Sequence, residues 1–272
     1  IMSKTGLKRK GKEKYYTSLA VVKKLLVSYN KIIERNDTDL WIEPSAGNGS
    51  FTSYLGDRNL VAYDIAPEGD NIIKQDFFDL NLDIWSIPLH FIGNPPFGRQ
   101  SSIAIQFIKR ITACEKTKSL AFILPKSFKK DSMKRYFPLN YHLEHEEDVD
   151  KDGFTMEGTN IDVPCVFQIW VKKDQEREKP VKLEPKGYEF TKKLQGRYAL
   201  RRVGVRAGLI LDMFLHPLSE ISEQSHYFMK LDEGDEKFIG KYEETINFEH
   251  NNTVGPKSIS KQEFIQVLNQ LF

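Results

Sequence analysis

The sequence predicts an α/β protein with a Rossmann-like, seven-stranded, mostly parallel sheet whose last strand is antiparallel, followed by a small C-terminal α+β appendage. Helix and strand patterns alternate up to residue 173, which is typical of a parallel sheet. The last two strand patterns have no helix between them, so we expect an antiparallel pair. A charged, Pro-containing and aperiodic stretch, 172–186, then predicts a linker.

Apolar residues at helical spacing predict the helices of the main domain. Thr17 or Ser18 can cap a first helix, whose apolar positions are Val22, Leu25, Leu26, Tyr29 and Ile33. Ser101 or Ser102 can cap a second helix, whose apolar positions are Ala104, Phe107, Ile108 and Ile111. A terminal helix is predicted by a capping box of Ser260 and Glu263, with an apolar stripe of Phe264, Val267, Leu268 and Leu271.

Short runs of buried character predict the strands. They cover residues 39–43, 60–64, 72–77, 90–93, 120–124, 141–149 and 163–173, with a further short strand at 225–231. The chain therefore divides into a basic N-terminal arm (1–13), a main α/β domain (14–175) and a small C-terminal domain (187–272). Substrate recognition is the role we consider for the last of these.

The composition excludes several classes of protein. The chain has 272 residues, 40% of them hydrophobic, which is enough for a large core and too many for a disordered protein. Its two cysteines, Cys114 and Cys165, do not make a disulfide scaffold and suit a reducing compartment. No apolar run approaches the roughly 20 residues of a membrane span, and no apolar segment follows the basic N-terminus as in a secretory leader. We therefore expect an intracellular protein of the cytoplasm or nucleus.

Basic residues gather in two places although 40 Lys and Arg nearly balance 38 Asp and Glu. The first cluster holds Lys4, Lys8, Arg9, Lys10, Lys12, Lys14, Lys23 and Lys24. The second holds Lys186, Lys192, Lys193, Arg197, Arg201, Arg202 and Arg206. Either cluster alone is explained by a solvated surface. Because the two flank the motifs described next, together they favour contact with the phosphates of a nucleic acid.

Small residues follow the first predicted strand in the segment Glu43-Pro44-Ser45-Ala46-Gly47-Asn48-Gly49. They let backbone N–H groups approach a ligand, although a tight turn explains a lone Gly-x-Gly equally well. Acidic residues close the first three strands, at Glu43, Asp64 and Asp76. Asp64 suits ribose hydroxyls and Asp76 an adenine amino group, with Phe77 or Ile65 against the base. Neither the second glycine turn of a dinucleotide site nor the Lys-Ser/Thr of a P-loop is present.

The segment Asn94-Pro95-Pro96-Phe97 follows the fourth predicted strand. Two prolines stiffen the backbone and present Asn94 and Phe97 at the carboxyl edge of the sheet. An amino group conjugated to a ring is a poor nucleophile because its lone pair is delocalised. The side-chain oxygen of Asn94 and the carbonyl of Pro95 can accept both of its N–H bonds and stabilise the charge that develops during attack. Phe97 offers a face on which a planar base can stack.

Taken in order, these motifs resemble the class I S-adenosyl-L-methionine (AdoMet)-dependent methyltransferases, in the amino-methyltransferase branch with an Asn-Pro-Pro-aromatic motif. Lys14-Tyr15-Tyr16-Thr17 resembles the N-terminal cofactor-binding motif of the gamma-type adenine-N6 enzymes. The resemblance covers residues 14–173. Phe97 departs from the tyrosine that many of the DNA enzymes carry, and the segment after residue 180 matches no target-recognition domain.

The resemblance implies a role for each motif residue. Tyr16 and Thr17 close over the methionine end of AdoMet, and the residues that line the same end are Glu43, Pro44, Ala46, Gly47 and Gly49. Asp64 holds the ribose, and the adenine lies against Ile65, Asp76 and Phe77. The target base is gripped by Asn94, Pro95, Pro96 and Phe97, with Asn94 also at the cofactor. The basic clusters, and not the resemblance, suggest nucleic-acid contacts for Lys126, Arg201 and Arg202; a solvated surface explains the basic stretch 126–135 equally well.

The leading hypothesis is therefore an AdoMet-dependent methyltransferase acting on adenine N6 in nucleic acid, with DNA slightly favoured over RNA. Methylation of a protein glutamine or an rRNA guanine uses the same motif, and a silent nucleic-acid-binding module is an alternative outside catalysis. The six histidines are scattered, so we expect no metal site. A membrane and a partner subunit are not indicated. The segment 150–162 suits a substrate clamp and an ordinary loop equally well.

Overall fold

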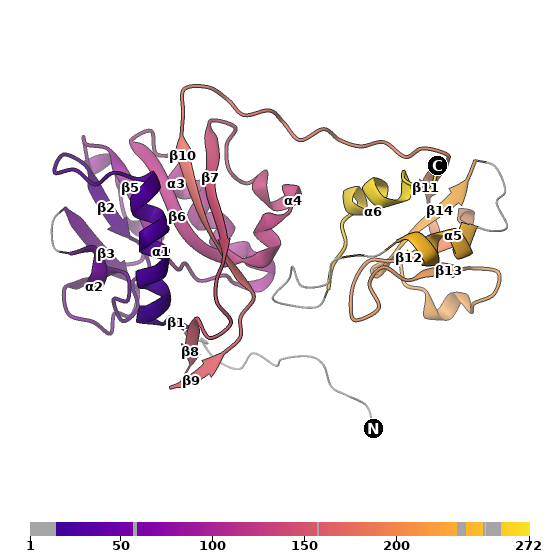
Figure 1. Cartoon of the computed structure of the whole chain (residues 1–272), viewed down its shortest axis with the longest axis horizontal. Coiled ribbons are helices and arrows are strands. Elements are labelled where there is room, and N and C mark those ends of the chain that lie inside the picture. Colours follow the sequence, from indigo (N-terminus) through magenta and orange to yellow (C-terminus); the bar gives the residue numbers. More distant parts are fainter. Residues whose placement is uncertain (1–14, 57–58, 157, 233–237, 247, 249–256) are drawn as a thin grey trace. The chain divides into compact units, whose positions relative to one another are not determined.

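The computed structural model describes residues 15–56, 59–156, 158–232, 238–246, 248 and 257–272 (Figure 1). The expected basic arm, 1–13, lies outside these residues. The chain forms two compact units, and the boundary between them along the chain falls between Glu178 and Lys179, inside the predicted linker 172–186.

A seven-stranded sheet with the order β4-β3-β2-β5-β6-β10-β7 forms the first unit. Its strands are β2 (Leu40–Glu43), β3 (Leu60–Asp64), β4 (Ile72–Lys74), β5 (Leu89–Gly93), β6 (Thr117–Pro125), β7 (Tyr141–Asp148) and β10 (Cys165–Lys172). Neighbouring strands from β4 to β6 are parallel, whereas β10 is antiparallel to both β6 and β7. The predicted fold class is confirmed, and the last strand lies between two others instead of at an edge.

One strand is shorter than predicted. β4 ends at Lys74, although the sequence pattern continued to residue 77. Asp76 turns the chain because its Oδ1 accepts a hydrogen bond from the backbone N–H of Phe78 at 2.9 Å. A 3₁₀ turn, η1 (Phe77–Asp79), begins there.

Helices α1 (Leu19–Ile32) and α3 (Ser102–Ala113) cover opposite faces of the sheet (Figure 1). Trp41 of β2 donates its indole N–H to the Tyr29 hydroxyl of α1 at 2.8 Å. The next residue, Ile42, points to the other face and packs in the core cluster that contains Phe107 of α3. This alternation follows from the two-residue period of a strand. Two shorter helices, α2 (Thr52–Leu55) and α4 (Asp131–Lys134), follow β2 and β6 in sequence.

The starts of α1 and α3 differ from each other. Ser18 caps α1, since its hydroxyl accepts from the N–H of Val21 at 3.4 Å. Ser101 stands at the start of α3 with a φ of 62° and makes no capping hydrogen bond with its side chain within the described chain. The Phe97 carbonyl instead accepts from the N–H groups of Ile103 at 3.1 Å and Ala104 at 3.4 Å. The loop that carries Phe97 is thereby tied to α3.

A second, small sheet was not predicted. β8 (Phe154–Met156) and β9 (Thr159–Ile161) form a hairpin in the connection from β7 to β10, and β1 (Tyr16–Thr17) pairs with β8. Figure 1 shows this hairpin beyond the ends of β7 and β10. Within 150–162, the described residues of β8 and β9 therefore pair with each other, and β8 holds the motif that precedes α1.

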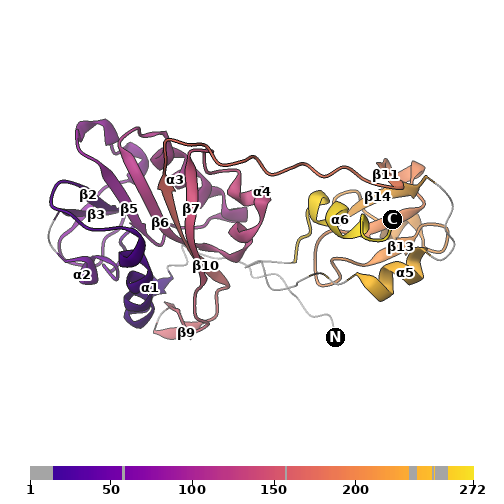
Figure 2. The same ribbon diagram turned by 45° about the horizontal axis from the view of Figure 1, so that its top comes forward.

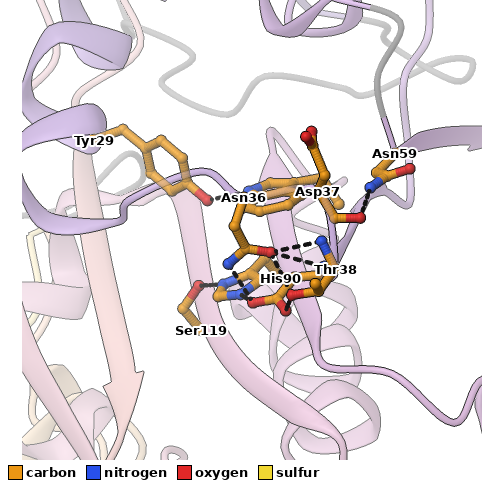
Figure 3. A network of polar contacts seen from close by, with 9 residues as sticks. Tyr29, Asn36, Asp37, Thr38, Asn59, His90 and Ser119 are labelled. Carbon is orange, nitrogen blue, oxygen red and sulfur yellow. Dashed lines mark hydrogen bonds and ion pairs between the residues drawn. The ribbon is translucent and has the colours of Figure 1, made fainter.

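A buried polar network ties the amino ends of three strands together (Figure 3). His90 of β5 contacts Ser119 of β6 through Nδ1 at 2.7 Å and Asp39, which precedes β2, through Nε2 at 3.0 Å. Its ring stacks on Trp41 with a centroid distance of 4.7 Å. Burial lowers the pKa of His90 against the opposing effect of Asp39. This histidine is a structural residue at the amino ends of the strands, whereas the Gly-rich and Asn94 loops follow the carboxyl ends.

The second unit is an α+β fold, as predicted. Its antiparallel sheet has the order β11-β14-β12-β13, and its elements are β11 (Tyr188–Thr191), β12 (Tyr198–Arg201), β13 (Ile210–Asp212), β14 (His226–Leu231), α5 (Phe238–Thr245) and α6 (Lys261–Leu268). The predicted capping box is confirmed: Ser260 and Glu263 bond each other's backbone N–H at 2.8 and 3.2 Å. Phe264 and Leu268 of α6 are fully buried.

Further 3₁₀ turns connect the elements of both units. They are η2 (Leu82–Ile84), η3 (Arg99–Ser101), η4 (Lys126–Lys129), η5 (Lys193–Gln195) and η6 (Leu218–Glu220). In the described part of the chain, no helix is long and apolar enough to cross a membrane.

Candidate active site

The order of the strands reverses direction between β2 and β5. From β2 the chain continues outward to β3 and β4, while β5 pairs with the other side of β2 and continues to β6. A crevice forms at the carboxyl ends of two such strands, and open α/β sheets bind ligands there. Glu43 ends β2 and Gly93 ends β5, so the Gly-rich loop and the Asn94 loop both start at this point.

The Asn94 side chain is held on one side only. Its Nδ2 donates to the Thr17 hydroxyl oxygen at 3.2 Å. Its Oδ1 is buried and has no hydrogen-bond partner among the described residues. A buried acceptor without a partner costs free energy. Because Asn94 also stands at the carboxyl end of a sheet strand, where open α/β folds bind ligands, its Oδ1 is a candidate ligand contact.

The loop that carries Asn94 contacts the Gly-rich loop directly. The Ser45 hydroxyl donates to the backbone carbonyl of Asn94 at 3.3 Å. Pro95 is buried and Pro96 is exposed. Because both proline rings fix φ, Asn94 is presented on a rigid backbone.

Hydrogen bonds to Asp64 shape the Gly-rich loop. Asp64 Oδ2 accepts from the N–H of Gly47 at 2.8 Å and Oδ1 accepts from Ala66 at 2.7 Å. Ala46 is tied to the same strand, since its N–H donates to the Tyr63 carbonyl at 2.8 Å. Gly47 has a φ of 57°, a conformation that glycine adopts without strain. Asp64 therefore organises the loop in addition to standing at the expected ribose position.

Tyr16 closes over this loop. Its hydroxyl donates to Glu68 Oε2 at 2.6 Å, and its ring lies 3.7 Å from the position of a Cβ on Gly47. Burial, and then Glu68 and Asp64, raise the pKa of Tyr16 to about 12. The tyrosine is thus a neutral donor that covers the loop.

Glu43 is buried at the start of the loop, with 2% of its surface exposed. Its Oε2 accepts from the backbone N–H of Thr52 at 2.9 Å and also from the Thr52 hydroxyl. Burial and the nearby Asp64 raise the pKa of Glu43 to about 8 against the opposing hydrogen bonds from Thr52. Glu43 therefore anchors the start of α2 and holds a proton at neutral pH. Pro44, which follows it, is also buried.

Of the residues expected around an adenine ring, Ile65 is exposed and Phe77 is buried. Ile65 is 56% exposed beside the carboxyl end of β3. Phe77 is 2% exposed, and its ring stacks on Phe107 with a centroid distance of 4.8 Å. The Phe77 ring thus belongs to the core, because it seals the sheet against α3, and Ile65 is the side chain of this pair that a base can contact. Asp76 caps η1 beside them.

The expected substrate-binding residues are spread over both units. Phe97 is half-buried and packs on the main core. Lys126 forms an ion pair with Asp148 at 2.7 Å. Arg201 and Arg202 belong to the second unit, where the Arg202 guanidinium lies 5.1 Å from the Tyr227 ring centroid. The structure therefore groups Phe97 with Asn94, and it gives Lys126 and Arg202 partners of their own.

Three contributors to the site were not found by sequence reasoning. Ser45 links the two loops, Glu68 holds Tyr16, and Thr52 satisfies Glu43. Only the contact between Thr52 and Glu43 could be predicted from the sequence. Thr52 begins the helix after the Gly-rich turn, and the start of a helix favours a nearby acidic side chain such as Glu43. No group of three or more His, Cys, Asp or Glu side chains suited to a metal ion occurs in the described residues.

No protein-family model and no curated protein matches this sequence. Solved structures with a similar fold include the 23S rRNA methyltransferase ErmE, with a TM-score of 0.41 and 15% identity over 58% of this chain and 68% of that one. Another is the E. cuniculi Mtq2–Trm112 complex, responsible for methylation of the termination factor eRF1, with a TM-score of 0.40 and 14% identity over 58% of this chain and 98% of that one.

Proposed function

We propose that this protein is an AdoMet-dependent methyltransferase that modifies the exocyclic N6 amino group of adenine in nucleic acid, with DNA as the first substrate to test. One observation carries the proposal. The buried Oδ1 of Asn94, without a partner among the described residues, stands on a proline-stiffened loop at the carboxyl ends of β2 and β5, next to the Gly-rich loop.

The chemistry of Asn94 suits an amino substrate. Oδ1 can only accept a hydrogen bond, so its complement is a donor, and the N–H of an amino group is one. Accepting that bond withdraws the nitrogen lone pair from the ring and stabilises the positive charge that develops on nitrogen. An acceptor fixed before the substrate arrives does this without reorganisation. No general base is needed to form the N–C bond: the C–S bond of the donor would break to leave a neutral thioether, and the methylated nitrogen would release one proton to water.

The surrounding residues fit AdoMet. Bound AdoMet supplies a methyl carbon made electrophilic by its sulfonium. The Gly-rich loop has no side chain at Gly47 and Gly49, the Tyr16 ring covers Gly47, and Asp64 lies at the end of β3, where the ribose of a nucleoside is expected. Ile65 offers 56% of its surface for an apolar contact with the adenine ring.

A target adenine must reach Asn94 as a single base. In duplex DNA this requires flipping the nucleotide out of the stack, which costs a few kcal/mol and much less in a single strand or loop. The half-buried Phe97 lies on the same loop as Asn94 and provides an aromatic face for such a base.

The second unit offers a surface for the rest of the nucleic acid. Phe214 is 83% exposed, with the Arg197 guanidinium 5.9 Å from its ring centroid. Phe214 and Leu218 both lie between β13 and β14. Lys193 donates to the Leu218 carbonyl at 2.8 Å, and the neighbouring Lys192 is exposed. An exposed aromatic ring among cations suits stacked bases and phosphates.

Incubation with methyl-labelled AdoMet and DNA or RNA, followed by nucleoside analysis, tests the proposal. We expect labelled N6-methyladenine. Label in guanine, in a protein glutamine, or nowhere would contradict it, and the DNA and RNA reactions run in parallel identify the polymer.

A further inference from the structure

The carboxamide of Asn94 has two different ends, and only one of them can receive a substrate N–H. Nδ2 is a donor and Oδ1 an acceptor. In this structure Nδ2 is bonded to Thr17 Oγ1 at 3.2 Å, and Oδ1 remains without a partner among the described side chains. The hydrogen bond to Thr17 therefore holds the carboxamide in the orientation that leaves Oδ1 available to a substrate N–H.

Thr17 is itself firmly held. It is 6% exposed and pairs with Phe154 of β8. The next residue, Ser18, donates its backbone N–H to the Gly153 carbonyl at 2.9 Å and then caps α1. The Thr17 hydroxyl is thus fixed by the β8–β9 hairpin on one side and by a helix start on the other.

Successive side chains of a strand point to opposite faces. Tyr16 contacts the Gly-rich loop through Glu68 and lies near Gly47, whereas Thr17 contacts Asn94. The two-residue strand β1 therefore contacts the Gly-rich loop with one side chain and Asn94 with the next.

We propose that Thr17 is a positioning residue that holds the Asn94 carboxamide with Oδ1 presented to the substrate amino group, and that the β8–β9 hairpin sets the position of Thr17 through β1. This inference rests on the proposed function and adds a role to the cofactor contact expected for Thr17. It assigns the hairpin, which sequence reasoning left open between a clamp and a loop, to the support of the acceptor.

The substitution Thr17→Val tests this role, because valine has nearly the same shape and removes only the oxygen. Asn94 Nδ2 would then be buried without a partner, and the carboxamide would rotate away from its productive position. We expect kcat at saturating AdoMet and nucleic acid to fall by about 10- to 100-fold, the scale of a misplaced catalytic group. The Kd for AdoMet should change by less than about threefold, because valine keeps the shape of Thr17 at the expected methionine end, and Asp64, Tyr16 and the Gly-rich loop are unaltered.

Two further variants act as controls. Thr17→Ser keeps the oxygen and should restore kcat to within about threefold of the wild-type value. Thr159→Val makes the same substitution at an exposed position of β9, which does not pair with β1, and should leave kcat unchanged. Thermal unfolding of all variants shows whether the fold is kept.

The outcomes separate this inference from the proposed function. An unchanged kcat in Thr17→Val, or a loss that appears only as weaker AdoMet binding, overturns the positioning role. A wild-type protein that methylates neither DNA nor RNA counts against the proposed function. In that case the NMR signals of the Asn94 side-chain amide, identified by their absence in Asn94→Ala, decide the contact independently: they should shift in Thr17→Val and stay in place in Thr17→Ser.

Discussion

At the scale of single residues, Asn94 and Glu43 are buried polar groups in different states. Asn94 Oδ1 has no partner in the described structure, whereas Glu43 Oε2 accepts two hydrogen bonds from Thr52. A group of the first kind is stabilised when a ligand arrives, and a group of the second kind stabilises the protein that contains it. The two residues should therefore respond differently to substitution.

Replacing Asn94 by alanine should abolish turnover without abolishing binding. We expect kcat to fall by about 10²- to 10³-fold, as for the loss of one preorganised hydrogen-bonding group. The affinities for AdoMet and nucleic acid, measured by calorimetry and fluorescence anisotropy, should stay within about threefold of wild type. A variant that methylates at the wild-type rate contradicts the acceptor role.

Replacing Glu43 by glutamine should change how stability depends on pH. The pKa of Glu43 is raised to about 8, so the folded state favours the protonated carboxyl more than the unfolded state does. Its contribution is fully present below its ordinary pKa of 4.5 and is lost as pH rises toward 8. Each unit of pKa shift corresponds to about 1.4 kcal/mol.

Urea unfolding of both proteins at pH 5 and pH 8 measures this effect. Relative to Glu43→Gln, the wild-type protein should lose a few kcal/mol of unfolding free energy between the two pH values. An equal pH dependence in the two proteins would show that Glu43 is ionised in the fold. Titration of other groups, including His90, cancels in the comparison.

At the scale of elements, the β8–β9 hairpin decides where β1 lies. Gly153 stands at its base, where a Cβ would come within 2.8 Å of the Asp150 carbonyl oxygen and 2.9 Å of Val149 Cγ1. Those atoms belong to the backbone and to a packed side chain, so the hairpin itself must shift.

Gly153→Ala should therefore displace β8 and, through its pairing with β1, the Thr17 hydroxyl. We expect kcat to fall by about tenfold, which is smaller than the loss from removing Asn94. Thr159→Ala, at an exposed position of β9, is the control and should retain wild-type kcat. Equal activity of the Gly153 and Thr159 variants would show that the hairpin does not act on the site.

At the scale of the whole molecule, nucleic-acid affinity should depend on the second unit as well as the first. Exchanging Lys192 and Lys193 for glutamine removes two cations of the second unit, one of which donates to the Leu218 carbonyl. If both contact phosphates, the slope of log Kd against log salt concentration should decrease by about 1 for each lysine. Lys182→Gln is the matched control, because this lysine is 78% exposed in the linker and paired with Glu184.

Phe214→Ala should weaken binding in a different way. Stacking of a base contributes about 1–3 kcal/mol and involves no counterion release, so affinity should fall while the salt slope stays constant. Fluorescence anisotropy titrations with single-stranded DNA and RNA at several salt concentrations distinguish the two effects. Val181→Ala is the control, since Val181 is equally exposed at 83% but lies in the linker.

The sequence by itself determined the main sheet, its antiparallel last strand, the helix starts at Ser18 and Ser260, and the positions of Asn94 and the Gly-rich turn. These features depend on local periodicity, capping residues and proline geometry, which act over a few neighbouring residues. The end of β4 was missed because Asp76 caps a turn inside the predicted strand 72–77.

Only the tertiary structure decided how these motifs work together. It placed the Phe77 ring in the core, paired Lys126 with Asp148, and brought Thr17 to Asn94 across 77 positions of sequence. It also showed that Asn94 Oδ1 is left without a partner among the described residues. Burial and pairing depend on which distant segments meet, and β-strand pairing such as that of β1 with β8 carries little local signal in two residues.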